Sequence, residues 1–597
     1  MTTLQKLWHM LTAAQRRAAL LLLALMLIGM VLETLGIGLI IPALALMTQS
    51  DITSKYPEMA PWLARLGNPD HNKLIIGGML ALVSVYAVKA LFLSFLAWRQ
   101  ARFVAWMQED ISRRLFTAYL RQPYVFHLQR NSAQLIRNVV TETYLLTQTG
   151  FISGLNLATE ILVIVGISGL LLAVEPVGAL VVVTTAGLAG WGIVHLPRRH
   201  ILRWGKARQL HEGLRIQSLQ EGLGSAKDVI LLGREQEFVR QYQVHNAAMA
   251  KLGERQVTVQ QIPRLALEFI AVSGLAALVL IMIAQGKPTE SLLPSLGLFA
   301  AAAFRFLPSV NRIIYALQSV RYALPVIDTL YSELGLLDGT DAPKRGRTLQ
   351  FEKALMLDQI SYSYPSAERQ VLRGVSISVP RGASVGFIGG SGAGKSTLVD
   401  IILGLLTPVS GTVSVDAVDI QSCLRGWQDQ IGYVPQSIFL TDDTLRRNVA
   451  FGVNADQIDE AAVRRAISAA QLDQFVSDLP EGLDTLVGER GVRLSGGQRQ
   501  RIGIARALYH EPSVLVLDEA TSSLDTDTER GVMEAVRALQ GHKTVLIVAH
   551  RLSTVEHCDR LFRIERGQIV EEGETAVMLG KIASGPISPV YVPAPNP

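Results

Sequence analysis

The sequence predicts two fused domains of different class: an all-α membrane domain of six transmembrane helices with long cytoplasmic helical extensions, and an α/β phosphate-loop domain. Three observations support this prediction. The chain has 597 residues, which is too long for one hydrophobic core. Its apolar runs gather in the first half, and the mean hydropathy of +0.29 is high for a soluble protein. Residues 389–397 read Gly-Gly-Ser-Gly-Ala-Gly-Lys-Ser-Thr, directly after the apolar run 385–388.

Six membrane spans are expected, because about 20 mostly apolar residues cross a bilayer. They lie at residues 18–47, 74–98, 147–174, 177–197, 265–285 and 290–318. The long links after the second and fourth spans are rich in arginine, which places them on the cytoplasmic side. These links also read as helical, with short transverse helices expected within 121–131 and 222–235.

Changes in composition along the chain predict the domain boundaries. We expect the membrane domain over 1–330, a polar linker over 331–350, the α/β domain over 351–580 and a disordered tail over 581–597. The net charge of +5 is modest, and its placement fits membrane orientation and no nucleic-acid partner. The two cysteines, Cys423 and Cys558, exclude a disulfide framework and a thiolate metal site.

Ionisable residues inside the predicted spans are the candidate substrate contacts. Each costs about 2.5–3.5 kcal/mol to insert at mid-helix and tends to face a cavity or a partner. They are Glu33, Lys89, Arg264, Arg305 and Arg312. A cluster of such cations suits a phosphate-bearing substrate, because guanidinium groups bind phosphate through two parallel hydrogen bonds. The alternative is snorkelling to the interface, or pairing with Glu33, Glu160 or Glu268.

The glycine-rich stretch has the spacing of a phosphate-binding loop. Residues without a Cβ let backbone amides close around phosphate oxygens. Lys395 then reaches the β- and γ-phosphates, and Ser396 presents its hydroxyl to Mg²⁺. A helix beginning at Lys395 points its positive N-terminus at the nucleotide. The expected nucleotide contacts are Gly389, Gly390, Ser391, Gly392, Ala393, Gly394, Lys395, Ser396 and Thr397.

A second chemical signature is the apolar strand 514–517, which ends in Asp518 and Glu519. Two unpaired carboxylates at the end of a buried strand repel each other and lose hydration, so they indicate a function. Asp518 is placed to hold Mg²⁺, directly or through water. Glu519 is placed to orient or deprotonate the water that attacks the γ-phosphate.

With these motifs in place, the second half resembles the nucleotide-binding domain of ATP-binding-cassette (ABC) transporters. Tyr364 matches the aromatic residue that stacks on adenine, Gln436 the Q-loop and His550 the switch histidine. Ser495, Gly496, Gly497 and Gln498 match the signature, and Ser522-Ser523-Leu524-Asp525 matches the D-loop. The resemblance implies ATP and Mg²⁺ as cofactors, Ser396, Gln436 and Asp518 at the metal, and Glu519 and His550 as catalytic residues. It also implies two nucleotides held between two such domains, hence a homodimer or a heterodimer with a similar half.

Within that family the chain resembles exporters, and more narrowly bacterial flippases for lipid-linked oligosaccharides. The narrower resemblance rests on residues 33–42, 227–234 and 301–312. It implies a multi-pass protein of the inner membrane, with its nucleotide-binding domain in the cytoplasm, that moves a polyprenyl-diphosphate glycan outward. An exporter of another lipid, a drug or a peptide is the alternative. A nucleotide-gated channel or regulator is the alternative from another class, although Glu519 and His550 argue against it.

Overall fold

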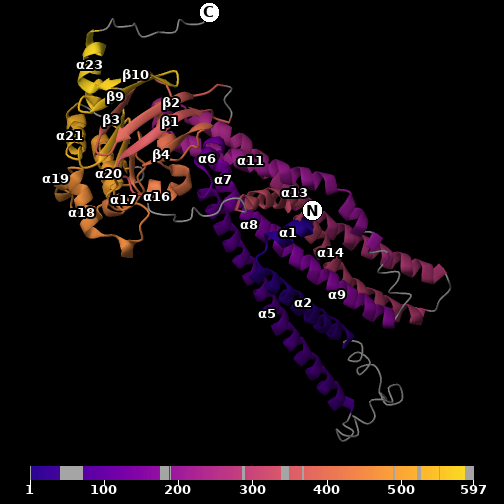
Figure 1. The fold of residues 1–597 in the computed structure, drawn as a ribbon. Helices are drawn as coiled ribbons and strands as arrows, with labels where there is room; N and C mark the ends of the chain where they lie inside the picture. The colour runs from indigo at the N-terminus through magenta and orange to yellow at the C-terminus, as the bar shows by residue number, and fades with distance from the viewer. Residues whose placement is uncertain are drawn as a thin grey trace, which may run out of the picture. The chain divides into compact units, whose positions relative to one another are not determined.

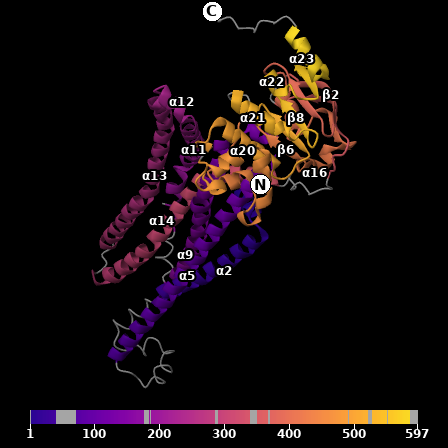
Figure 2. The ribbon, with the colours of Figure 1, turned by 90° about the vertical axis from the view of Figure 1, so that its left-hand side faces the viewer.

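The computed structural model describes residues 2–39, 71–174, 184, 187–188, 190–284, 289–337, 349–365, 369–488, 491–520, 526–549 and 551–584. The chain divides into two compact units. The first contains the described residues up to 122 and those of 129–337, and the second contains 123–128 and the described residues from 349 onward. Figures 1 and 2 show long helices in the first unit and strands with short helices in the second.

The described part of the first unit is helical throughout. Its helices are α1 (Thr3–Met10), α2 (Ala13–Gly38), α5 (His71–Leu120), α7 (Ser132–Arg137), α8 (Thr143–Leu145), α9 (Ile152–Val174), α11 (Arg198–Gly224), α12 (Ala226–Leu231), α13 (Glu235–Ala284) and α14 (Thr289–Leu334). Two π-helical segments, η2 (Asn138–Glu142) and η3 (Leu146–Phe151), and a 3₁₀ turn, η4 (Gly335–Leu337), complete it. Thr12 and Gln15 form a reciprocal capping box that fixes where α2 begins.

Helix length confirms the predicted extensions. α5 and α13 have 50 residues each. At about 1.5 Å per residue each is roughly 75 Å long, whereas the hydrocarbon core of a bilayer is about 30 Å thick. Within the described residues, three helical stretches are long and apolar enough to cross a membrane: Ala13–Gly38, His71–Leu120 and Ser132–Leu170. About half of the fourth predicted span, 177–197, lies outside the described residues.

Two helices continue a few residues past the expected boundaries. α14 continues to Leu334, past the expected domain end at 330, because its buried stripe of Ile327, Leu330 and Leu334 continues. α23 (Thr575–Ser584) runs past the expected end at 580. It is anchored by buried Met578 and by an ion pair of 3.0 Å between Lys581 and Glu571. The rest of the predicted tail and most of the predicted linker lie outside the described residues.

Short helices are found in both predicted stretches, as α6 (Tyr124–Gln129) and α12. Residues 123–128, which include most of α6, belong to the second unit by their contacts. Val125 packs against the core of that unit.

The second unit has the predicted α/β class and contains two sheets. One has the order β10-β9-β3-β8-β7-β6, and the other, which is antiparallel, has the order β2-β1-β4-β5. β3 pairs in parallel with β8 and β9, and β7 pairs in parallel with β6 and β8. The strands are β1 (Ala354–Tyr362), β2 (Leu372–Pro380), β3 (Ser384–Ile388), β4 (Ser410–Val415), β5 (Val418–Asp419), β6 (Ile431–Val434), β7 (Val514–Asp518), β8 (Thr544–Val548), β9 (Arg560–Glu565) and β10 (Gln568–Glu574).

The helices of the second unit, besides α6, follow these strands. They are α15 (Lys395–Ile402), α16 (Leu424–Gln428), α17 (Leu445–Val449), α18 (Glu460–Ala469), α19 (Asp473–Ser477), α20 (Gly496–Leu508), α21 (Thr526–Arg537), α22 (Leu552–Val555) and α23. Three 3₁₀ turns join them: η5 (Ile420–Cys423), η6 (Ala455–Gln457) and η7 (Gly482–Asp484). β3 and β8 are buried along their whole length, as apolar parallel strands covered on both faces should be. The carboxyl ends of β3, β6, β7 and β8 therefore lie along one sheet edge.

Candidate functional site

The loop after β3 has the backbone that the glycine spacing predicts. Gly392 and Gly394 have φ values of +74° and +105°, which favour glycine, and Gly394 is the residue that precedes α15. A Cβ at Gly394 would lie 2.8 Å from a methyl group of Leu372, and one at Gly389 would collide with the carbonyl oxygen of Ile564. Positions 389 and 394 of the loop therefore require glycine.

Lys395 begins α15 and is folded back over this loop. Its ammonium group donates to the carbonyl oxygens of Gly389 at 2.9 Å and Gly390 at 3.1 Å, and the residue is only 5% exposed. Burial lowers the pKa of Lys395, while the charges of Glu519 and Asp518 raise it. The cation expected to meet the terminal phosphates is therefore held inside the loop and close to both acids.

The next strands along the edge bring Gln436 and Glu519 together. Gln436, just after β6, donates from Nε2 to Oε2 of Glu519 at 2.8 Å. Glu519 follows β7 with φ +50°, a left-handed backbone that is uncommon outside glycine and asparagine, and its amide donates to the carbonyl of Val548 at 3.0 Å. A constrained backbone at the end of a buried strand fixes where this carboxylate points.

Two residues that sequence reasoning missed lie beside Asp518. Tyr433 of β6 hydrogen-bonds to Asp518, and burial together with the charge of Asp518 raises the pKa of Tyr433. Asp400 of α15 is partly buried, and burial followed by the charge of Asp518 raises the pKa of Asp400 to about 6. The available signal for Asp400 was a lone acid in the apolar run Leu398-Val399-Asp400-Ile401-Ile402.

Tyr364 lies against the same helix. Its hydroxyl is 3.1 Å from Oγ1 of Thr397, and its ring meets that of Tyr362 edge-on at 5.1 Å between centroids. The aromatic residue expected to stack on adenine is thus positioned by its own domain beside the start of α15.

The expected signature residues begin a different helix. Ser495 caps α20 through a reciprocal box: its amide donates to Gln498 Oε1 at 2.8 Å, and its Oγ accepts from the amide of Gln498 at 3.2 Å. Gly496 and Gly497 form the first turn of this helix. Among the described residues, no hydrogen bond or ion pair joins Ser495–Gln498 to the loop 389–397. His550 and the expected D-loop, 522–525, lie outside the described residues.

In the membrane unit, the predicted cations whose side chains are described are paired with carboxylates. Lys89 lies 2.7 Å from Glu33, Arg264 lies 3.0 Å from Glu268, and Arg312 lies 2.5 Å from Glu160. These pairs join α5 to α2, two turns of α13, and α14 to α9, so each of the three described cations has its own carboxylate partner. The pairing alternative therefore describes these three cations. Arg305 lies on α14, but its side chain is outside the described residues.

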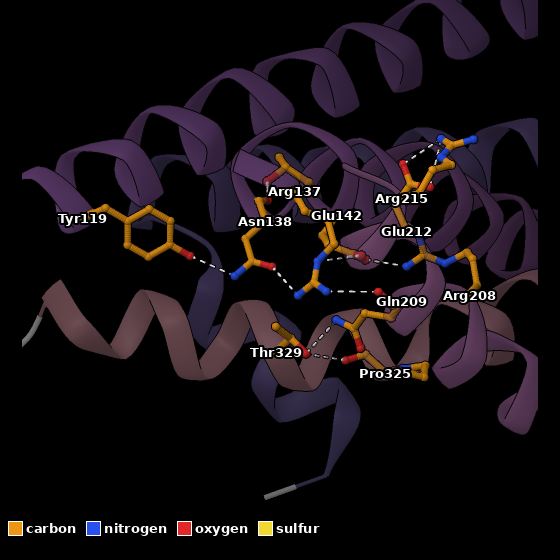
Figure 3. Close-up of polar contacts among 11 residues, drawn as sticks. Tyr119, Arg137, Asn138, Glu142, Arg208, Gln209, Glu212, Arg215, Pro325 and Thr329 are labelled. Atoms are coloured by element: carbon orange, nitrogen blue, oxygen red, sulfur yellow. Dashed lines mark hydrogen bonds and ion pairs between the residues drawn. The ribbon is translucent and has the colours of Figure 1, made fainter. Parts of the chain in front are cut away.

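A buried charge network in the first unit was not predicted. Glu142 of η2 is fully buried and lies 2.5 Å from Arg208 of α11 and 3.5 Å from Arg137 (Figure 3). Asn138 accepts from Arg137 at 3.0 Å and donates to the hydroxyl of Tyr119 on α5 at 3.1 Å. No local pattern indicates this network, because Arg208 is one of many cations in the links between the spans.

Two regions of the chain match described families. Residues 19–299 match the ABC transporter transmembrane region, and residues 372–522 match the ABC transporter domain. The chain is 30% identical to an ATP-dependent lipid A-core flippase of Thiobacillus denitrificans, over 85% of each protein. The chain belongs to the ABC transporter family. This ABC transporter is also 31% identical to an ATP-dependent lipid A-core flippase of Cupriavidus metallidurans, over 78% of this chain and 79% of that protein.

A solved structure supports the fold of this ABC transporter. A bacterial Atm1-family ABC exporter with ATP bound aligns with a TM-score of 0.76 at 23% identity, over 96% of this chain and 97% of that one. The predicted fold class is thus confirmed. The protein is an ATPase that couples ATP hydrolysis to transport across a membrane.

Proposed function

We propose that this ABC transporter is a flippase of the inner membrane for a phosphate-bearing, lipid-linked glycan, with a polyprenyl-diphosphate oligosaccharide as the first candidate. One observation supports this cargo most strongly: a polar pocket of about 190 Å³ between α5, α9 and α14. Its polar lining consists of Gln100, Ser153, Asn156, Thr159, Glu160, Arg312 and Tyr315.

The chemistry of this pocket fits a sugar phosphate. Amide and hydroxyl side chains supply donors and acceptors that match sugar hydroxyl groups. The side chain of Arg312 is 52% exposed, whereas that of Glu160 is 13% exposed, so the guanidinium group has free faces while its carboxylate partner is enclosed. A substrate phosphate takes those free faces of Arg312, and its affinity grows because phosphate accepts two parallel hydrogen bonds from a guanidinium. A hydrophobic drug would form no hydrogen bond or ion pair with these groups.

A second candidate cargo is a lipid A-core glycolipid. Identity of about 30% to proteins named lipid A-core flippases favours it. Both candidates combine a lipid anchor with sugars, and the pocket's chemistry suits either.

ATP hydrolysis at the nucleotide site supplies the energy for transport, and different residues of the site bind the phosphates, the attacking water and Mg²⁺. Backbone amides of 389–394 and the ammonium group of Lys395 hold the phosphates, and Glu519 orients the attacking water. Ser396, Gln436 and Asp518 would hold Mg²⁺, which neutralises charge on the phosphates. In a homodimer, the N-terminus of α20 in the second copy completes the site. ATP binding then closes the two cytoplasmic domains, the membrane halves open outward, and hydrolysis resets them.

The cargo is tested by ATPase activity of the full-length protein in liposomes, with three additions compared: a polyprenyl-diphosphate oligosaccharide, a lipid A-core glycolipid, and neither. Wild type should be stimulated severalfold by its cargo. Arg312→Ala should keep basal hydrolysis and lose stimulation, because the pocket's exposed cation is removed. Arg240→Ala is the matched control, since Arg240 makes an exposed ion pair with Glu237 away from the pocket.

Each outcome assigns or rejects a cargo. Stimulation by only one glycolipid identifies that one. Equal basal activity with no response to either lipid, in wild type and in Arg312→Ala alike, would reject the flippase and favour an exporter of another lipid, a drug or a peptide.

A further inference from the structure

A second pocket, larger than the first, lies between α2 and α5. It has a volume of about 600 Å³. One wall is formed by Ala18 and Leu22 of α2, and the other by Arg99, Arg102, Phe103 and Trp106 of α5. Phe103 and Leu22 are buried, so apolar side chains line the pocket together with two guanidinium groups.

The pocket lies where both helices leave the membrane. On α2 the cations Arg16 and Arg17 come directly before the apolar run that starts at Ala18. On α5 the apolar run ends at Trp98, and Arg99 follows. Because Ala18 and Arg99 line one pocket, the two helices change from charged to apolar at the same level. Arginine excess on that side marks it as the cytoplasmic leaflet, and tryptophans are enriched at such interfaces.

The two arginines of the pocket are available for a ligand. Among the residues that the structure describes, no hydrogen bond or ion pair joins Arg99 or Arg102 to a carboxylate, and Arg102 stacks on Trp98 at 5.6 Å. Further along the same helix the situation is different, since Arg113 and Arg114 lie 2.6 and 3.6 Å from carboxylate oxygens of Asp110.

We propose that this pocket binds the phosphate of an anionic phospholipid from the cytoplasmic leaflet, with Arg99 and Arg102 on the headgroup and Leu22, inside the apolar run of α2, against the first carbons of the acyl chains. A bilayer lipid is favoured over a free phosphate ion because the basic groups lie at the membrane boundary, in one pocket with the start of the apolar run of α2. Glu109 lies at the cytoplasmic end of the pocket and weakens the affinity by its like charge. This site is separate from the cargo pocket at Arg312 and does not depend on the proposed cargo.

The experiment is a titration of the full-length, detergent-purified protein with phosphatidylglycerol, followed by native mass spectrometry that counts bound lipids. Arg99→Ala with Arg102→Ala should weaken binding of the tightest lipid by roughly tenfold or more, because each basic group near a phosphate contributes about fivefold. Glu109→Gln should strengthen it. Phosphatidylcholine should bind wild type and the double variant equally weakly.

Matched variants separate this site from other sources of binding. Lys251→Ala with Arg255→Ala removes the same charge from exposed positions of α13 and should bind phosphatidylglycerol as wild type does. If this control loses as much affinity as the pocket variant, the effect is one of net charge and the proposal fails. It also fails if Arg312→Ala abolishes phosphatidylglycerol binding while the pocket variant retains it. If the alanine variant does not fold, Arg99→Lys with Arg102→Lys should keep part of the affinity.

Discussion

At the scale of single residues, the nucleotide-binding domain positions its reactive groups by backbone constraint. Glu519 combines a left-handed backbone with a hydrogen bond from Gln436, and Lys395 is held by two loop carbonyls. Each group is thus placed before any ligand arrives, which reduces the reorganisation that catalysis requires. The proposed roles of these residues can be separated by single substitutions.

Glu519→Gln should retain ATP binding and lose hydrolysis by about 10²- to 10⁴-fold, because the amide cannot accept the proton of the attacking water. The nucleotide-bound closed dimer should then accumulate. Phosphate release and ATP binding, measured on the same preparation, check this. Glu511→Gln is the control, since Glu511 is also a glutamate with a left-handed backbone, φ +51°, but it pairs with Arg465 at the surface. Near-normal turnover in Glu519→Gln would remove Glu519 from its role.

Asp400 should make the nucleotide-free protein lose stability as pH rises. Its folded pKa of about 6 lies above its usual value of 3.8, so the folded state binds this proton more tightly than the unfolded state. The stabilisation is complete below the unfolded pKa and is lost as pH rises through the folded one, with a total on the order of 3 kcal/mol. Asp400→Asn should remove this slope between pH 4.5 and 7 and raise the melting temperature at pH 7.5.

Thermal unfolding at several pH values, in detergent without Mg²⁺, measures how stability depends on pH in wild type and in Asp400→Asn. Asp484→Asn serves for comparison, because a hydrogen bond from Arg446 lowers the pKa of Asp484 and its titration falls below this pH window. If the melting temperature of Asp400→Asn depends on pH as that of wild type does, the titration of Asp400 does not affect stability.

At the scale of elements, the sequence predicted what local patterns specify and missed what depends on packing between distant segments. Strand ends that carry Asp518 and Glu519, the glycine loop before α15 and the short helices α6 and α12 all follow from nearby residues. Glu142 could not be placed, since its partner Arg208 is far away in sequence and only the packing of η2 on α11 brings them together. The same limit applies to Asp400, whose neighbours come from β6 and β7.

The Glu142 network should hold η2, α11 and α5 together. Glu142→Gln removes the carboxylate from Arg137 and from Arg208, whose guanidinium group is buried, so we expect a loss of about 3–5 kcal/mol. Glu142→Leu with Arg208→Met should recover part of the loss, because both charges leave the interior. Thermal unfolding of detergent-purified protein measures both. The surface control Glu237→Gln breaks an exposed pair with Arg240 and should leave the melting temperature unchanged. If Glu142→Gln melts like this control, the network does not contribute to stability.

At the scale of the whole molecule, one chain supplies two anion-binding helix ends that the described contacts do not join. The N-terminus of α15 lies in the phosphate loop, and the N-terminus of α20 is capped by Ser495. The proposed dimer brings a second chain to these two helix ends. If that chain is a second copy, each nucleotide site takes its loop from one copy and its signature from the other.

Mixing two defective variants tests this arrangement. Lys395→Ala disables the loop, and Gly496→Asp places a carboxylate where the γ-phosphate must bind, although an acid in the first turn suits the helix itself. Each homodimer should be inactive. In a mixed dimer both lesions fall on one site, so the other site is intact. Random assembly then gives about half mixed dimers with one working site each, and thus about a quarter of wild-type ATPase activity. Neither variant alone contains both an intact phosphate loop and an intact signature. Recovery of activity on mixing would therefore require a nucleotide site shared between two copies. No recovery, although tagged copies of the two variants co-purify, would mean that each chain completes its own site or depends on a different half-transporter.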